Sequence, residues 1–117
     1  MKDFRTLKVW QKSHSLSLLV YKITEKFPKE ELFGITSQLR RAVVSIPTNL
    51  AEGSGRGSDK DFKRFVQIAM GSASESEYLI LLSKDLGYFS EENYGNLLVK
   101  IQEVKKMLSS LISKLKS

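Results

Sequence analysis

The sequence predicts an all-α protein, an antiparallel up-down four-helix bundle formed by residues 1–117 as a single domain. Two observations carry this prediction. Apolar residues recur with a period near 3.6 in four stretches, and no stretch alternates polar and apolar residues as a strand does. The chain also has only two prolines and seven glycines among 117 residues, which favours long helices joined by short loops.

The first helix is expected from about Leu7 to Phe27. It ends there because a proline follows, and the residue before a proline avoids the helical region. The second is expected from about Phe33 to Glu52, where the glycine-rich segment 53–57 breaks the pattern.

Pro47 lies inside the second pattern. It has no N–H to donate to the Val43 carbonyl, and its ring crowds that carbonyl, so we expect the second helix to be kinked at Pro47, with a kink or local break near residues 43–46. The hydroxyl of Thr48 or of Ser45 is expected to satisfy part of the freed backbone groups.

The third helix is expected to begin at Ser58, with Asp61 placed to complete a reciprocal capping box, and to stop near Gly87. The fourth begins at Ser90, and two glutamates in its first turn suit the positive end of the helix dipole. The last two helices thus carry their own start signals.

The first helix carries two apolar stripes, although a helix in a lone bundle has one face to bury. Trp10 and Tyr21 lie on the second stripe. They either pack over a neighbouring helix with their polar ends in water, or belong to a contact between subunits. The third helix is apolar nearly all round at residues 78–82. The residues predicted for a subunit interface are Trp10, His14, Leu18, Tyr21, Tyr78 and Leu82.

Residue types needed for most catalytic and metal sites are scarce. There is no cysteine and one histidine, so thiol chemistry, cysteine-based metal sites and the paired Glu-x-x-His motifs of di-metal bundles are excluded. Glu75 and Glu77, two apart on a helix, point away from each other. The glycine-rich segment lacks the Lys-Ser or Lys-Thr of a phosphate-binding loop. We therefore predict no catalytic residue, no metal and no cofactor, and a protein that is not an enzyme.

The amino end is polar, and the longest apolar run covers five residues, 78–82, against about 20 for a membrane span. The sequence thus predicts a cytoplasmic protein with no membrane partner.

Nineteen basic residues against 13 acidic ones give a net charge of +6. Arginine suits phosphate oxygens, so a basic surface on the bundle predicts binding to the backbone of RNA or DNA. For Arg40 and Arg41 the competing interpretation is pairing within the chain, with Glu52, Glu75 or Glu77. Arg40 and Arg41 form one basic set, and the run Arg56, Lys60, Lys63 and Arg64 forms a second. Both sets flank the glycine-rich segment, and we expect them to share one end of the bundle. The predicted nucleic-acid-binding residues are Arg40, Arg41, Arg56, Lys60, Lys63 and Arg64.

Several motifs stand in order along the chain. They are Val9-Trp10-Gln11-Lys12, the segment Phe27 to Gly34, the segments Thr36 to Ala42 and Ser45 to Gly53, and Gly71-Ser72 with Glu75 and Glu77. Together they resemble one family, the bacterial four-helix-bundle proteins encoded in intervening sequences of 23S ribosomal RNA genes, which often carry a ribosomal-protein label. The similarity covers about residues 4–90, and the fourth helix matches only in pattern.

The resemblance implies a homopentamer with a positively charged surface that binds nucleic acid. Accessory proteins of diversity-generating retroelements are also similar, which implies a reverse transcriptase as a partner. The leading hypothesis is therefore a non-enzymatic homo-oligomer that binds nucleic acid. The alternative is a protein–protein adaptor without a nucleic-acid role, and an enzyme acting on a small acidic ligand comes third.

Overall fold

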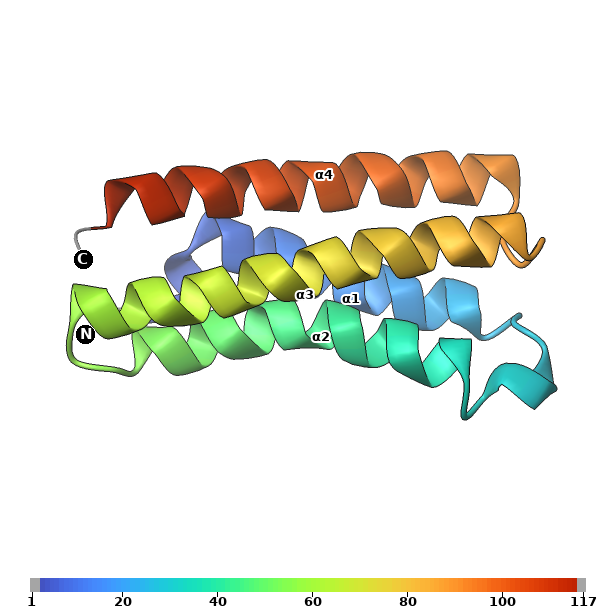
Figure 1. Ribbon diagram of the computed structural model, residues 1–117, viewed down its shortest axis with the longest axis horizontal. Coiled ribbons are helices and arrows are strands. Elements are labelled where there is room, and N and C mark those ends of the chain that lie inside the picture. Colours follow the sequence, from blue (N-terminus) through green and yellow to red (C-terminus); the bar gives the residue numbers. More distant parts are fainter. Residues whose placement is uncertain (1–2, 116–117) are drawn as a thin grey trace.

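The computed structural model describes residues 3–115 and shows an antiparallel up-down bundle of four helices, without strands in that range (Figure 1). This confirms the predicted fold class. The bundle measures 43 × 23 × 20 Å. Its elements are a 3-10 turn at Phe4–Thr6, α1 at Lys8–Thr24, a second 3-10 turn at Lys29–Glu31, α2 at Ile35–Ser54, α3 at Asp59–Asp85 and α4 at Glu91–Lys114.

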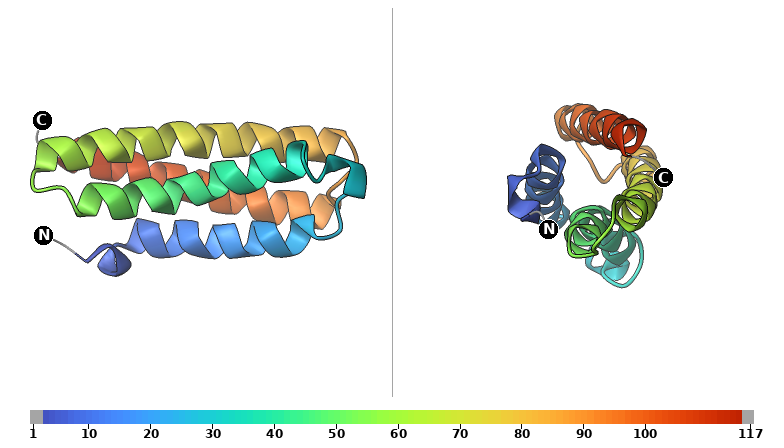
Figure 2. Two further views of the ribbon diagram at one scale, coloured as in Figure 1. Left: turned by 90° about the horizontal axis from the view of Figure 1, so that it is seen from below. Right: turned by 90° about the vertical axis from the view of Figure 1, so that its left-hand side faces the viewer.

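Each helix packs against two neighbours, with α1 and α3 at opposite corners, as the end view shows (Figure 2). The start of α1, the α2–α3 turn and the end of α4 lie at one end of the bundle, which we call the α2–α3 end (Figure 1). Leucine, isoleucine and valine side chains from all four helices fill the centre. The fully buried ones are Leu16, Val20, Leu39, Val43, Ile46, Leu50, Val66, Ile80, Leu97, Ile101, Val104 and Leu108.

The ends of α3 and α4 follow the predicted signals. The hydroxyls of Ser58 and Ser90 each accept a hydrogen bond from the amide three residues on, at 3.2 and 3.0 Å. Asp61 does not reach back to complete the capping box; its carboxylate faces Arg64 instead, at 4.0 Å. Helix α3 ends in a Schellman motif, in which Gly87 adopts φ +81°.

Helix α2 differs from its predicted range at both ends. It begins at Ile35, whose amide donates to the Glu31 carboxylate at 3.4 Å, and Phe33 stays outside the helix with 94% of its surface exposed. It ends at Ser54, so Gly53 is helical. A Cβ at Gly53 would lie 2.7 Å from the Phe65 Cβ, which shows how closely α2 approaches α3 there.

Pro47 does not break α2, which runs as one helix through this position. Of the two outcomes expected here, a kink or a local break, the break is therefore wrong. Neither Ser45 nor Thr48 bonds the Val43 carbonyl. Thr48 donates to the Val44 carbonyl at 2.7 Å, and Ser45 contacts Ser72 at 2.8 Å. The Val43 carbonyl instead accepts from the Ser17 hydroxyl of α1 at 3.2 Å. A neighbouring helix thus satisfies the group that proline leaves free.

Candidate functional site

The predicted basic residues do not form one patch. Arg40 and Arg41 lie in the first half of α2, whereas Arg56 follows its last residue. From Arg40 to the last residue of α2, Ser54, fourteen residues at 1.5 Å per residue span about 21 Å, and Arg56 lies beyond that end. The expectation that both sets share one end is therefore wrong, because α2 is long enough to carry them to different ends.

Arg40 joins α1 to α2. Its Nε donates to the Thr24 hydroxyl at 2.9 Å, its Nη2 lies 3.4 Å from the Tyr21 carbonyl oxygen, and its guanidinium sits 4.7 Å from the centre of the Tyr21 ring. Arg41 is exposed and has no acidic partner within 4.0 Å among residues 3–115. The two adjacent arginines thus differ in their surroundings, since one joins two helices and the side chain of the other is exposed.

None of the three acidic residues expected to pair with Arg40 or Arg41 does so within residues 3–115. Glu52 pairs with Arg56 at 3.2 Å. Glu77 accepts from the Lys105 ammonium at 2.9 Å, and this hydrogen bond lowers the pKa of the Glu77 carboxyl. Glu75 is exposed and forms no ion pair within residues 3–115.

The second predicted set surrounds the α2–α3 turn. The guanidiniums of Arg56 and Arg64 lie 5.0 and 4.5 Å from the centre of the Phe65 ring, so this buried ring supports two cations. Lys60 and Lys63, on the first turns of α3, form no ion pair within residues 3–115. The structure therefore brings four of the six predicted residues together.

Folding gathers the positive charge at the α2–α3 end. Cutting each helix near its middle assigns residues 3–16, 45–72 and 103–115 to that half, which we call the basic half. It holds ten basic and five acidic side chains, a surplus of five, and the other half holds seven basic and eight acidic ones. Five lysines of the basic half form no ion pair within residues 3–115: Lys8, Lys60, Lys63, Lys106 and Lys114.

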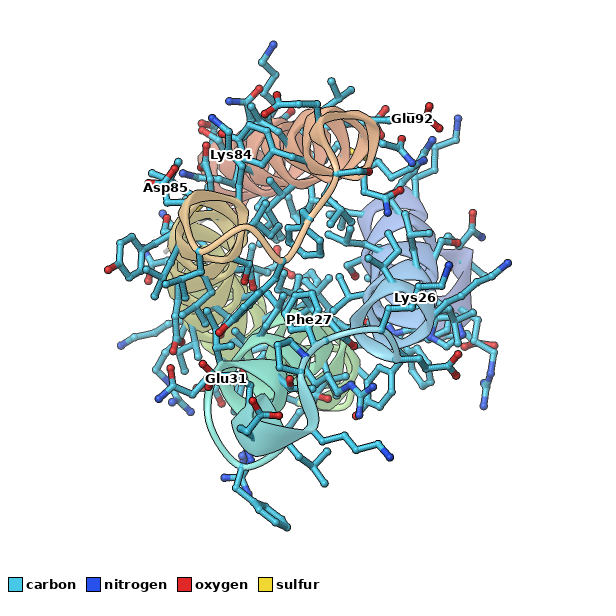
Figure 3. The ribbon with its side chains drawn as sticks, turned by 90° about the vertical axis from the view of Figure 1, so that its right-hand side faces the viewer. Lys26, Phe27, Glu31, Lys84, Asp85 and Glu92 are labelled. Atoms are coloured by element: carbon cyan, nitrogen blue, oxygen red, sulfur yellow. The ribbon has the colours of Figure 1, made fainter. Side chains whose placement is uncertain are left out.

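The opposite end carries both signs. Figure 3 looks onto it and shows Lys26 and Lys84 together with Glu31, Asp85 and Glu92 around the buried Phe27. The Glu31 carboxylate accepts from the Tyr88 hydroxyl at 2.9 Å, and this contact raises the pKa of Tyr88. The bond ties the α1–α2 connection to the α3–α4 connection, so the pKa shift has a structural cause.

Four of the residues predicted for a subunit interface line an open groove between α1 and α2. Trp10 and His14 stack with ring centres 4.8 Å apart, and Leu18 and Tyr21 are 61% and 46% exposed. The groove, of about 460 Å³, contains no acidic or basic residue other than His14. We call it the α1–α2 groove; it is lined by Phe4, Trp10, His14, Ser17, Leu18, Tyr21, Val44, Pro47, Thr48 and Ala51.

The two remaining interface residues lie on α3 and have different surroundings. Tyr78 is 57% exposed, whereas Leu82 is half-buried and packs against the core. Ile68 and Leu81, which are 42% and 41% exposed, join Tyr78 on the outward side of α3. The predicted set thus falls on two separate surfaces, and the structure does not bring them together within one chain.

The structure reveals two features that sequence reasoning missed. One is the α2 wall of the groove, formed by Val44, Pro47 and Ala51. The spacing of residues 44, 47 and 51 places them on one helix face, but only packing against α1 turns that face into a groove. The other is the axial charge separation, which appears once helix directions are known.

Within residues 3–115, no group of three or more His, Asp or Glu side chains is arranged to hold a metal ion. No helix in that range is long and apolar enough to span a membrane. What the fold presents is a four-helix bundle with a basic half and two exposed apolar surfaces, the α1–α2 groove and the outward side of α3.

Comparison with known proteins gives the family. Residues 5–110 match the family described as 23S rRNA-intervening sequence protein, and the chain belongs to this family. It is similar to a crystal structure from Bacteroides thetaiotaomicron, a protein of unknown function from the S23 ribosomal protein family. The two share 28% identity at a TM-score of 0.81, over 91% of this chain and 99% of the other. No curated protein matches the chain.

Proposed function

We propose that this protein is a non-enzymatic homo-oligomer that binds the backbone of nucleic acid through its basic half. The observation that carries the proposal is the charge separation, with a surplus of five positive charges in one half and one negative charge in the other. Four of the five acidic residues in the basic half are already paired, Asp3, Glu52, Asp61 and Glu103, which leaves its lysines available for phosphates.

This surface is better suited to binding the nucleic-acid backbone than to recognising individual bases. Phe65 is buried beneath Arg56 and Arg64, and Phe62 is half-buried, so neither ring offers an open face for a base to stack on. Lysines and arginines without such rings recognise phosphates by charge. The family's link to 23S rRNA makes RNA the first ligand to test.

Assembly would multiply the basic half. The resemblance to the pentameric bundles makes five copies the expected number, working in the cytoplasm. Each copy contributes the same phosphate-binding surface, so binding by the oligomer gains from several simultaneous contacts with one nucleic acid.

The test is binding to structured RNA and to duplex DNA at rising salt, with Lys60→Glu/Lys63→Glu as the variant. We expect log affinity to fall linearly with log salt, and the variant to bind at least about tenfold more weakly with a smaller salt slope. Lys26→Glu/Lys29→Glu is the matched control, because it makes the same charge change at the opposite end.

Two results would count against the proposal. Binding that is absent at low salt, or independent of salt, excludes a backbone contact. Equal losses of affinity in Lys60→Glu/Lys63→Glu and in Lys26→Glu/Lys29→Glu would show that net charge attracts the nucleic acid without a defined binding surface.

The α1–α2 groove favours a second candidate function, a protein–protein adaptor that docks a different protein, such as the reverse transcriptase that the retroelement resemblance implies. An apolar groove of this kind is a surface that proteins use for contact. Recovery of one stoichiometric protein partner from cells, unchanged by nuclease treatment, would favour this candidate over nucleic-acid binding.

A further inference from the structure

Gly71 stands in the middle of α3, and the protomer gives no reason for a glycine there. It is exposed, and a Cβ built on it meets nothing within 4 Å outside the helix's own backbone. Glycine in a helix interior weakens the helix relative to alanine. Tyr78 lies two turns further on, at almost the same angle around the helix, so both residues share its outward side.

This outward side of α3 is apolar and acidic. Ile68, Tyr78 and Leu81 are its exposed large side chains, and Glu75 and Asp85 are its charges. Residues 65–83 include no lysine or arginine, although the chain has 19 of them. We call this surface, residues Ile68, Gly71, Glu75, Tyr78, Leu81 and Asp85, the α3 face.

The α1–α2 groove has the complementary character. Its lining is apolar and contains no acid, and at the end near Tyr21 its margin is basic. Arg40 covers the Tyr21 ring, Arg41 precedes Val44 by one turn, and Lys22 follows Leu18 by one turn. These three cations outnumber the one acid of that margin, Glu25.

We propose that the α3 face of one copy docks into the α1–α2 groove of a second copy of this chain. The acidic residues of the face then meet the basic margin of the groove, and the absence of a side chain at Gly71 lets the partner's backbone come close. This inference rests on the homo-oligomer part of the proposed function, and it names the two surfaces that meet.

Such a contact is head-to-tail. The helices α1 and α3 occupy opposite corners and do not contact each other, so the groove and the face of one copy point to different neighbours. Different surfaces meeting at each contact generate a closed ring or an open chain, whereas a two-fold dimer would pair one surface with itself.

Cross-linking tests the pairing directly, because the chain has no cysteine of its own. Leu18→Cys places a thiol in the groove and Tyr78→Cys places one on the α3 face. A short bis-maleimide should link a mixture of the two single variants to each other, and neither variant to itself. Val99→Cys is the control; this residue is 66% exposed on α4 and should link to neither.

A charge-swap pair gives a second measurement on the full-length chain. Glu75→Arg places like charges against the basic margin and should weaken assembly by about tenfold or more, measured by light scattering over a dilution series. Combining it with Arg41→Glu should restore most of the assembly. The same Glu75→Arg change should leave the thermal unfolding of the dissociated protomer unchanged.

The outcomes separate this inference from the function it rests on. A wild-type chain that is monomeric at all concentrations overturns both the homo-oligomer and the docking. An oligomer in which Leu18→Cys links to itself, or in which Tyr78→Cys never links to Leu18→Cys, overturns the docking alone.

Discussion

The Ser17 hydroxyl of α1 lies 3.2 Å from the Val43 carbonyl oxygen of α2, the one acceptor that Pro47 leaves without a helical amide. Ser17 is 6% exposed and Val43 is fully buried, so water has no ready access to this carbonyl. Ser17 also lies 3.0 Å from the Ser13 carbonyl, and its single hydrogen is shared between the two acceptors. The contact therefore lets a proline stand inside a continuous helix.

Ser17→Ala should lower the free energy of unfolding by about 1–3 kcal/mol, because it leaves the buried Val43 carbonyl without a donor. Urea denaturation measures the loss. In a Pro47→Ala background the same change should cost less, since the restored amide of residue 47 bonds that carbonyl. Equal costs in both backgrounds would show that Ser17 acts elsewhere. Ser15→Ala, an exposed neighbour, is the control.

Sequence periodicity was sufficient to predict the four helices and their order, because each apolar stripe follows from a spacing along one chain. The starts of α3 and α4 were also predictable, since Ser58 and Ser90 bond to amides only three residues away. The partner of the Val43 carbonyl was not, because Ser17 is 26 residues away and reaches it only when α1 packs on α2.

The candidate site also contains one part that is local in sequence and another that depends on how the helices pack. The cluster of Arg56, Lys60, Lys63 and Arg64 is local in sequence, and it is local in space. Arg40 is separated from that cluster by most of the length of α2, and the rise per residue of the predicted helix was already sufficient to place the two sets apart. The basic half, in contrast, combines residues from all four helices, so its charge appears only when helix directions are known.

The ion pair between Glu77 and Lys105 should make stability depend on pH. Its hydrogen bond lowers the Glu77 pKa below 4.5, so the pair stabilises the fold above about pH 4.5 and loses its effect as pH falls through the folded-state pKa. Lys105→Met should therefore cost about 1 kcal/mol at pH 7 and progressively less in acid.

Denaturant titrations at a series of pH values measure this difference. Lys106→Met removes a neighbouring charge that has no ion pair within residues 3–115, and its effect on stability should not vary in the same way. A cost for Lys105→Met that stays constant from pH 7 into acid would contradict the assignment of the pair.

Gly53→Ala should destabilise the protein even though alanine is the better helix former. The added methyl would lie 2.7 Å from the Phe65 Cβ and 3.0 Å from the Phe62 ring, so α2 and α3 must move apart. Overpacking of this kind costs about 1–3 kcal/mol, which outweighs a gain in helix propensity of about 1 kcal/mol.

Gly95→Ala in α4 is the matched control, because nothing lies within 4 Å of its added methyl and only the propensity gain remains. The thermal unfolding temperature should fall for Gly53→Ala and rise for Gly95→Ala. A shift in the same direction for both would mean that the approach of α2 to α3 at Gly53 tolerates a methyl group.

Arg40 and Arg41 should respond differently to the same substitution. Arg40→Ala removes the 2.9 Å bond to Thr24 and the cation over Tyr21, and should lower the free energy of unfolding by about 1–2 kcal/mol. Arg41→Ala removes an exposed side chain without an ion pair within residues 3–115 and should change it by less than about 0.5 kcal/mol.

The consequence for ligand binding follows from this difference. Reversing both charges at once confounds unfolding with loss of contact, whereas Arg41→Glu leaves the α1–α2 link intact. Because Arg41 also lies at the proposed groove margin, RNA affinity is compared at a concentration where light scattering shows the same assembly for this variant and the wild type. Affinity for RNA measured at one temperature, with the folded fraction of each variant determined by circular dichroism, separates the two effects. If Arg40→Ala kept full stability yet lost RNA affinity, Arg40 would be a ligand contact, and its bond to Thr24 would be incidental.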